Sequence, residues 1–438
     1  MSNLSIFLYE WKHFVRSPFK VVALLLFAVA AIYGLHNGSH LYFEQLTEVE
    51  KIQTKAVEEK QEYLSQYDEG KLVNEDRPWI NMAEPFWAIW FSSGYNLKEP
   101  SPAMVYSIGQ AEQYGFYKKV TFWASPYDTD MAEEIANPER LQTGSLDFAF
   151  VLLFLSPLLL LILLYNLQSA EAEQGFLPLV EVQTASKNGW LITRMAFYVV
   201  LSTLVIIGLL LYGATLTNVF KTSSNAFGQV LLYSLAYLAF WSVIYFFILK
   251  NGKSILGNTL QMIGIWLLFA FIVPGTVHQV IGITQPTNLM TDFINVRDQQ
   301  QELYAQPDSV FVAELVNLFP KITDTPSFRD STKRKAAMSA STAAIVNEMK
   351  KQSIQPVKND YQEKNDFITK TFWFNPVSFF QNQFNSIAQT HFDDYETHRQ
   401  DIQSAIDHRI EVLISDVWND TKVDKSKYLE YAENEGGK

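Results

Sequence analysis

Five long runs of apolar residues set the strongest limit on what this chain can fold into. Crossing about 30 Å of hydrocarbon takes a helix of about 20 mostly apolar residues, because lipid offers no hydrogen bonds to an irregular backbone. The mean hydropathy of the whole chain is near zero only because polar blocks separate the apolar runs. The runs are Val21–Leu35, Phe148–Tyr165, Met195–Tyr212, Ala226–Leu249 and Leu260–Ile283. The sequence therefore predicts an α-helical polytopic membrane protein with about five spans.

The predicted organisation alternates spans with polar segments. We place the spans at residues 21–36, 146–166, 195–213, 226–249 and 255–283. The other segments are an interfacial helix (1–20), a first outer region (37–145), a connection (167–194), an outer turn (214–225), a link (250–254) and a second outer region (284–438).

Positive charge orients these spans. The N-terminal segment carries Lys12 and Arg16 beside Trp11, which is typical of an amphipathic helix at a membrane surface. A secretory signal peptide is the competing interpretation, but the residues that follow the first apolar run form a poor cleavage site. Basic residues gather in this segment, in the connection and in the link, and alternation of the spans puts the same three segments on one side. We therefore expect them in the cytoplasm and the two outer regions beyond the membrane.

The connection between the second and third runs has the pattern of a docking element. Apolar residues recur at roughly helical spacing over Phe176–Val180. Glu171, Glu173 and Gln174 precede them, at a place where acidic residues stabilise a helix N-terminus. A short, charged, amphipathic segment between two spans must be exposed at one membrane face, which suits docking better than catalysis.

The first outer region combines a helical stripe with an aromatic segment. The apolar stripe from Leu46 to Ala56 predicts that the first span continues as a helix beyond the membrane. The prolines and Gly94 of the next segment argue against one long helix there. Its large rings are Trp79, Phe86, Trp87, Trp90 and Phe91. Two interpretations stay open: these rings lie on lipid or over a substrate path, or they form the core of a small domain. The second outer region is polar and mostly helical in pattern.

Polar residues inside the apolar runs allow two roles. Pro157, near the middle of the second run, predicts a kink that is tolerated if a neighbouring helix covers the freed carbonyl. Other polar side chains either line a path or form hydrogen bonds between packed helices, and packing is the default role in a bundle. They are Ser156, Ser202, Thr203, Gln229, Ser234, Ser242, Asn258 and Gln261.

No stretch supplies a catalytic, nucleotide or metal site. Gly252-Lys253-Ser254 ends like a phosphate-binding loop, but Phe247 stands where that loop needs a glycine. The histidines at 36 and 40, and the three between 391 and 408, lack a tight His-Glu signature, which favours an exposed polar face. The chain has no cysteine, which excludes thiolate ligands, and its net charge of −12 without a basic tract argues against nucleic acid as a partner. We expect no enzyme activity, metal or cofactor in this chain.

The connection also resembles a known family. Tyr165-Asn166 followed by SAEAEQGFLPLVEVQTASKNGWLITR is similar to the segment after the second helix in permease subunits of ABC-2 type transporters. The family's acidic pair, glycine, alternating leucines and basic residue correspond to Glu171 and Glu173, Gln174-Gly175, Leu177 and Leu179, and Lys187. Segments such as IGQAEQYGFYKKVTF, ANPERLQTGSLDFAF and NPVSFFQNQFNSIAQTHFDDYETHRQDI resemble the DUF3526-containing subgroup. The resemblance covers most of the chain, more weakly over 41–96 and 306–355.

This resemblance implies an ABC-2 type transmembrane bundle in the bacterial inner membrane. It implies that the connection sits on a separate ATPase, that two such subunits hydrolyse ATP with Mg²⁺, and that a second permease, identical or homologous, completes the assembly. Lipid and an envelope or periplasmic protein are further expected partners. The family normally has a sixth helix, which we expect to be missing from this chain. We expect an exporter; the alternative is a membrane scaffold or sensor that relays ATP-driven motion to an envelope partner without transport.

Overall fold

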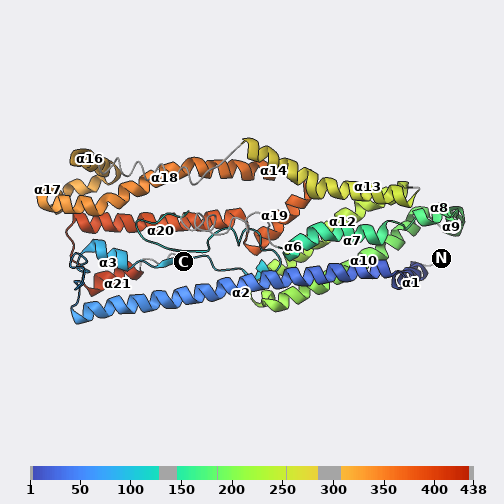
Figure 1. Cartoon of the computed structure of the whole chain (residues 1–438), viewed down its shortest axis with the longest axis horizontal. Coiled ribbons are helices and arrows are strands. Elements are labelled where there is room, and N and C mark those ends of the chain that lie inside the picture. The colour runs from blue at the N-terminus through green and yellow to red at the C-terminus, as the bar shows by residue number, and fades with distance from the viewer. Residues whose placement is uncertain (1–2, 128–145, 185, 253, 285–306, 434–438) are drawn as a thin grey trace.

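The computed structural model describes residues 3–127, 146–184, 186–252, 254–284 and 307–433. The molecule is elongated, with α1 (Asn3–Val15), α8 (Ser169–Glu173) and α9 (Leu177–Gln183) at one end and α3 (Pro85–Phe91), α17 (Pro326–Arg329) and α21 (Lys425–Glu433) at the other (Figure 1). Its two large hydrophobic clusters lie in different parts of the molecule, although their residues alternate along the chain. We call these parts the membrane bundle and the distal domain.

The membrane bundle contains five helical stretches, among the described residues, that are long and apolar enough to cross a membrane. This confirms the predicted multi-span helical architecture. The helices are α2 (Pro18–Glu69), α6 (Phe148–Phe150), η2 (Val151–Leu155), α7 (Ser156–Leu164), α10 (Lys187–Leu216), α12 (Ser224–Asn251), α13 (Ile255–Leu267), η3 (Leu268–Ile272) and α14 (Val273–Thr284). The stretches η2 and η3 are single π-helical turns inside otherwise α-helical spans. A short helix, α11 (Val219–Thr222), joins α10 to α12.

Helix α2 runs from the bundle into the distal domain without a break. It begins at Pro18, which separates it from α1, and its 52 residues extend over about 78 Å. The expected first span, 21–36, is therefore only the first part of α2, and the prediction that this span continues as a helix is confirmed. The helix ends at Gly70, whose left-handed φ of 71° suits a residue without Cβ.

The condition for a tolerated kink at Pro157, a neighbouring helix over the freed carbonyl, is met. Proline cannot donate to the carbonyl four residues earlier, which here belongs to Leu153. The hydroxyl of Tyr237, on α12, donates to that carbonyl at 2.5 Å. A π-helical turn, η2, immediately precedes the proline-containing α7. The neighbouring helix thus covers the freed carbonyl.

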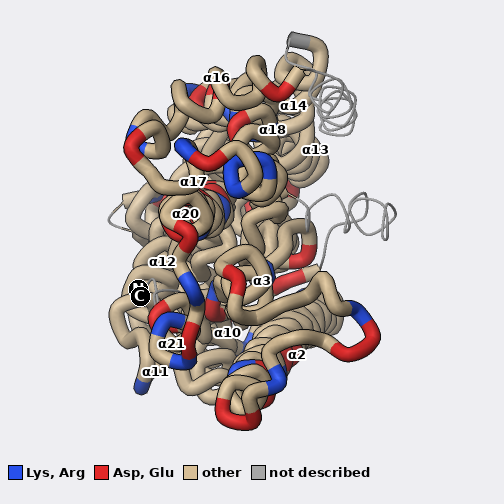
Figure 2. Tube along the Cα trace, turned by 90° about the vertical axis from the view of Figure 1, so that its left-hand side faces the viewer, with Lys and Arg blue, Asp and Glu red and all other residues tan. Residues whose placement is uncertain are grey.

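The distal domain packs the far half of α2 against helices from the end of the chain. Its core includes residues of α3, α18 and α20. Besides α2, α3, α17 and α21, its elements are β1 (Tyr95–Leu97), β2 (Tyr117–Lys119), α16 (Asp308–Leu318), η4 (Pro320–Asp324), α18 (Ser331–Thr371) and α20 (Phe392–Trp418). The strands are antiparallel, with Asn96 opposite Lys118. Viewed from this end, acidic and basic positions are interspersed over the helices (Figure 2).

Helix α19 (Pro376–Ala388) returns from the distal domain to the bundle. Phe380 and Phe384 belong to the bundle's hydrophobic cluster, and the ring of Phe380 lies 5.0 Å from that of Tyr237 in α12. The sequence placed all of 284–438 beyond the membrane, whereas α19 packs against a candidate span. The reason is its apolar face, which needs cover that the distal domain does not give it. The 3₁₀ turn η1 (Pro102–Val105) also packs on the bundle, against α2.

Candidate functional site

The predicted connection folds as two short helices, α8 and α9, joined at Gly175. Gly175 has a φ of 76°, a left-handed conformation that a residue with a side chain adopts at a cost. Glu171 lies in the first turn of α8, where an acidic residue was expected, and Glu173 is the last residue of that helix, so neither leads directly into α9. A turn at Gly175 separates them from that helix. Gln174 is exposed beside the turn.

One side of α9 presents apolar residues to the outside of the chain. Phe176, Leu179 and Val182 are 53%, 58% and 87% exposed, and their spacing of three puts them on one side of the helix. Leu177 is half-buried. Val182 was not among the predicted docking residues, although its position three residues after Leu179 continues the helical spacing.

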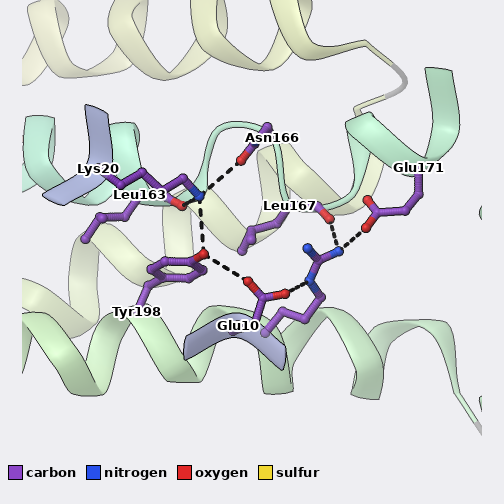
Figure 3. A network of polar contacts seen from close by, with 8 residues as sticks. Glu10, Lys20, Leu163, Asn166, Leu167, Glu171 and Tyr198 are labelled. Atoms are coloured by element: carbon purple, nitrogen blue, oxygen red, sulfur yellow. Dashed lines mark hydrogen bonds and ion pairs between the residues drawn. The ribbon is translucent and has the colours of Figure 1, made fainter. Parts of the chain in front are cut away.

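Glu171 is held by a buried cation. The Arg194 guanidinium donates to the Glu171 carboxylate, and its Nε donates to Glu10 Oε1 at 2.5 Å (Figure 3). Arg194 is 5% exposed and Glu10 is fully buried. Arg194 also donates to the carbonyl of Leu167. One arginine of α10 therefore fixes α8 and the N-terminal helix α1 to the same point.

The polar network continues into two further elements. The hydroxyl of Tyr198 donates to Glu10 Oε2 at 2.9 Å. The Lys20 ammonium, at the start of α2, donates to the carbonyl of Leu163 at 2.7 Å and to Asn166 Oδ1 at 3.2 Å. The site thus contains two carboxylates, of Glu10 and Glu171, and two cations, of Arg194 and Lys20, so that their formal charges cancel. Removal of any one of them leaves an unpaired charge. Neither Glu10 nor Lys20 was among the residues that the sequence singled out.

One hydrogen bond and one ion pair attach the outer side of the connection to the neighbouring helices α13 and α10. The Glu173 carboxylate accepts from the backbone N–H of Ile255, the first residue of α13, at 2.7 Å. Lys187 lies in the first turn of α10 and pairs with Glu181 of α9 at 3.1 Å. The α8–α9 unit is therefore attached to both α10 and α13, while the side that carries Phe176 and Val182 remains exposed.

The predicted interfacial helix lies beside this unit as α1. Trp11 is 52% exposed and its ring lies 6.5 Å from that of Phe197. Lys12 and Arg16 are exposed. Glu10, immediately before Trp11, points into the network described above. The exposed side of α1 is thus aromatic and basic.

The aromatic residues of the first outer region lie in the distal domain. Phe86, Trp90 and Phe91 pack against its core, with the rings of Phe86 and Trp90 5.1 Å and 5.3 Å from Phe122. Trp87 packs on Phe86, at 5.1 Å between ring centres. Trp79, by contrast, is 66% exposed. The packing of three of these rings matches the interpretation as a domain core.

The Gly252–Ser254 link serves helix packing. A Cβ on Gly252 would lie 1.5 Å from Asn258 Oδ1, and Ser254 Oγ accepts from the backbone N–H of Gly257 at 3.1 Å as the cap of α13. Lys253 lies outside the described residues, as do the resembling residues 136–145 and the last five of the chain. The described residues contain no group of three His, Cys, Asp or Glu able to hold a metal ion.

Comparisons with family models, with curated proteins and with solved structures found no match for this chain. The resemblance to ABC-2 type permeases therefore stays a prediction from the sequence.

Proposed function

We propose that this chain is the permease subunit of an ABC-2 type exporter in the bacterial inner membrane. In this proposal α8 and α9 face the cytoplasm and dock on a separate ATPase subunit. Two ATPase subunits, with Mg²⁺, hydrolyse the ATP, and a second permease, identical or homologous, completes the transmembrane part. The distal domain lies on the other side of the membrane, where it meets an envelope protein.

The observation that carries this proposal is the exposed apolar face of α9 on a firmly attached helix pair. An exposed apolar face of this kind marks a contact with another protein or with a membrane, and in this proposal the partner is the ATPase. The ion pair of Glu171 with Arg194 and the hydrogen bond of Glu173 to Ile255 connect α8 to two spans. A force applied at α9 would reach those spans through these contacts.

The proposal is tested by purifying the chain from its native membrane and measuring ATP hydrolysis and the ATPase chains that accompany it. Val182→Asp places a charge at the centre of a docking contact, so the associated ATPase should fall at least tenfold. Gly175→Pro, which cannot adopt a positive φ, and Leu177→Asp should act in the same direction. Val57→Asp is the matched control, because Val57 is 56% exposed on the distal part of α2. An ATPase that is absent from the wild type, or retained by Val182→Asp, would contradict the proposal.

A relay of motion without transport is the second candidate, and two observations favour it. Helix α2, which carries Lys20 of the polar network in its first turn, extends to the distal domain as one unbroken helix of 52 residues. Within the bundle, Ser234 and Ser242 donate to carbonyls of their own helix, those of Val230 and Leu238, and the core around them is apolar. Vesicles that hydrolyse ATP and move the distal domain, but accumulate no cargo, would favour the relay over export.

A further inference from the structure

The distal domain contains a large cavity that the proposed function does not use. Its volume is about 1120 Å³. One wall is the strand segment Gly94–Glu99, and the facing wall is one side of α20. Cavities that hold small molecules have volumes of about 300–1,000 Å³, so this one suits a larger ligand.

The strand wall presents an unpaired edge. The Lys98 N–H donates to the carbonyl of Phe116 at 2.8 Å, and the Val120 N–H donates to that of Gly94 at 2.9 Å, so these residues of the strand segment face β2. In an antiparallel ladder the alternate residues, Tyr95 and Leu97, direct their N–H and C=O groups to the opposite side. The only sheet of the described residues has two strands, and no described group bonds to those backbone atoms. All six residues from Gly94 to Glu99 line the cavity, as they do when a strand lies along a wall.

The α20 wall is polar and as long as a short extended peptide. Its lining includes a row of residues that recurs every three or four positions, Asp394, Thr397, Asp401, Ser404, His408 and Val412, with His398, Ala405 and Arg409 beside it. From Asp394 to Val412 the helix rises about 27 Å. An extended chain of about eight residues has the same length. The wall is thus matched in length to a strand laid beside β1.

A buried polar atom on the same wall also lacks a partner. His398 lines the cavity and is 6% exposed, yet its Nε2 has no hydrogen-bond partner among the described residues. Burial, with the charges of Lys98 and Arg399, lowers the pKa of His398 to about 4, so the ring is neutral at pH 7. A neutral ring nitrogen can accept from, or donate to, a peptide group. The cavity therefore offers both backbone and side-chain hydrogen-bonding groups that the described part of the chain does not satisfy.

The charged groups favour a basic side chain in the ligand. The two cations of the lining are directed to acceptors of this chain: Lys98 donates to the carbonyl of Gln389 at 2.7 Å, and Arg409 to that of Ile89 at 2.9 Å. Asp401 is exposed in the middle of the α20 wall. Its carboxylate is the complement of a lysine or arginine.

We propose that this cavity binds an extended peptide segment of another protein, which adds as a strand to the free edge of β1 and places a basic side chain opposite Asp401. Strand addition of this kind gains affinity from main-chain hydrogen bonds and specificity from the pockets for alternate side chains. The inference depends on the distal domain alone and not on the proposed function.

The test uses the full chain in lipid nanodiscs and a displayed library of linear 12-residue peptides. We expect the selected peptides to carry lysine or arginine. Their affinity should fall at least tenfold for Ser404→Trp, which fills the cavity from an exposed position of α20. It should be unchanged for Glu411→Trp, the same replacement at an exposed position of α20 outside the cavity. The proposal is overturned if no selected peptide loses affinity for Ser404→Trp while keeping its affinity for Glu411→Trp.

Amide hydrogen exchange at single residues gives a second measurement on the unsubstituted chain. A bound strand should slow exchange at Tyr95 and Leu97 at least tenfold and leave Lys98, which already bonds to β2, unchanged. Protection along α20 without protection of Tyr95 and Leu97 would mean that the cavity takes ligands in another way, and would also overturn the proposal.

Discussion

The carboxylate of Glu173 accepts a hydrogen bond from the backbone N–H of Ile255 at 2.7 Å, and this contact joins the end of α8 to the beginning of α13. A carboxylate at a helix N-terminus is stabilised by the free N–H groups and the helix dipole. Two residues earlier, Glu171 reaches in the other direction, to Arg194 of α10. Helix α8 therefore connects two spans that follow each other only through α12.

Loss of the Arg194 guanidinium should destabilise the chain severely. Arg194→Met leaves the buried Glu10 without its cation, and the free energy of unfolding should fall by about 3–5 kcal/mol. Glu173→Gln, at an exposed carboxylate, should cost about 1 kcal/mol or less. Thermal unfolding in nanodiscs measures both. Replacing Glu10 by Gln in the Arg194→Met background should restore part of the loss, whereas additive effects of the two substitutions would show that the pair is not coupled.

The hydroxyl of Tyr237 should contribute to stability, because Pro157 cannot donate to the Leu153 carbonyl that this hydroxyl bonds. Tyr237→Phe leaves the Leu153 carbonyl without a donor in an apolar core, and should cost about 1–3 kcal/mol. Tyr233→Phe is the control, since Tyr233 on the same helix packs on Phe380 through its ring. In a Pro157→Ala background the helix regains its own N–H, so Tyr237→Phe should cost much less. An equal cost in both backgrounds would contradict this role.

The spans were predictable because apolar length is a local property of the sequence. The cover of the Leu153 carbonyl could be expected too, because Pro157 always frees the carbonyl four residues earlier. The network of Glu10, Glu171 and Arg194 could not be predicted from the sequence, because it joins residues far apart in the chain. Each of them looks like an ordinary charged residue in its own segment.

Two further features had weak signals in the sequence. Val377, Phe380 and Phe384 follow helical spacing and mark the apolar face of α19, but spacing does not say which part of the molecule covers that face. The distal cavity had no local signal at all, because β1 and α20 are brought together only by the tertiary fold. The sequence thus indicated elements and exposed faces better than the contacts between them.

Acid should destabilise the distal domain through His398. Burial lowers the pKa of this ring to about 4, against about 6.5 in the unfolded chain. Between these values the unfolded state binds a proton that the folded state does not, so stability falls as the pH falls from about 6.5 to about 4. The loss is at most about 3 kcal/mol. Unfolding free energies measured at several pH values should show this slope, and His398→Gln should flatten it. A slope that persists in the variant would assign it to other groups.

The return of α19 to the bundle predicts that the residues just before it contact lipid. Trp373 is 85% exposed and lies three residues before α19, whose Phe380 packs against Tyr237 within a candidate span. An exposed tryptophan at the edge of a membrane bundle is typical of the lipid–water interface. Because the chain has no cysteine, Trp373→Cys can carry a single environment-sensitive dye. In nanodiscs that dye should be quenched by spin-labelled lipids at least threefold more than a dye at Val73→Cys, an exposed site in the distal domain. Equal quenching at the two sites would contradict this prediction. It would place the start of α19 in water, and the apolar face of α19 would then contact only other parts of the protein.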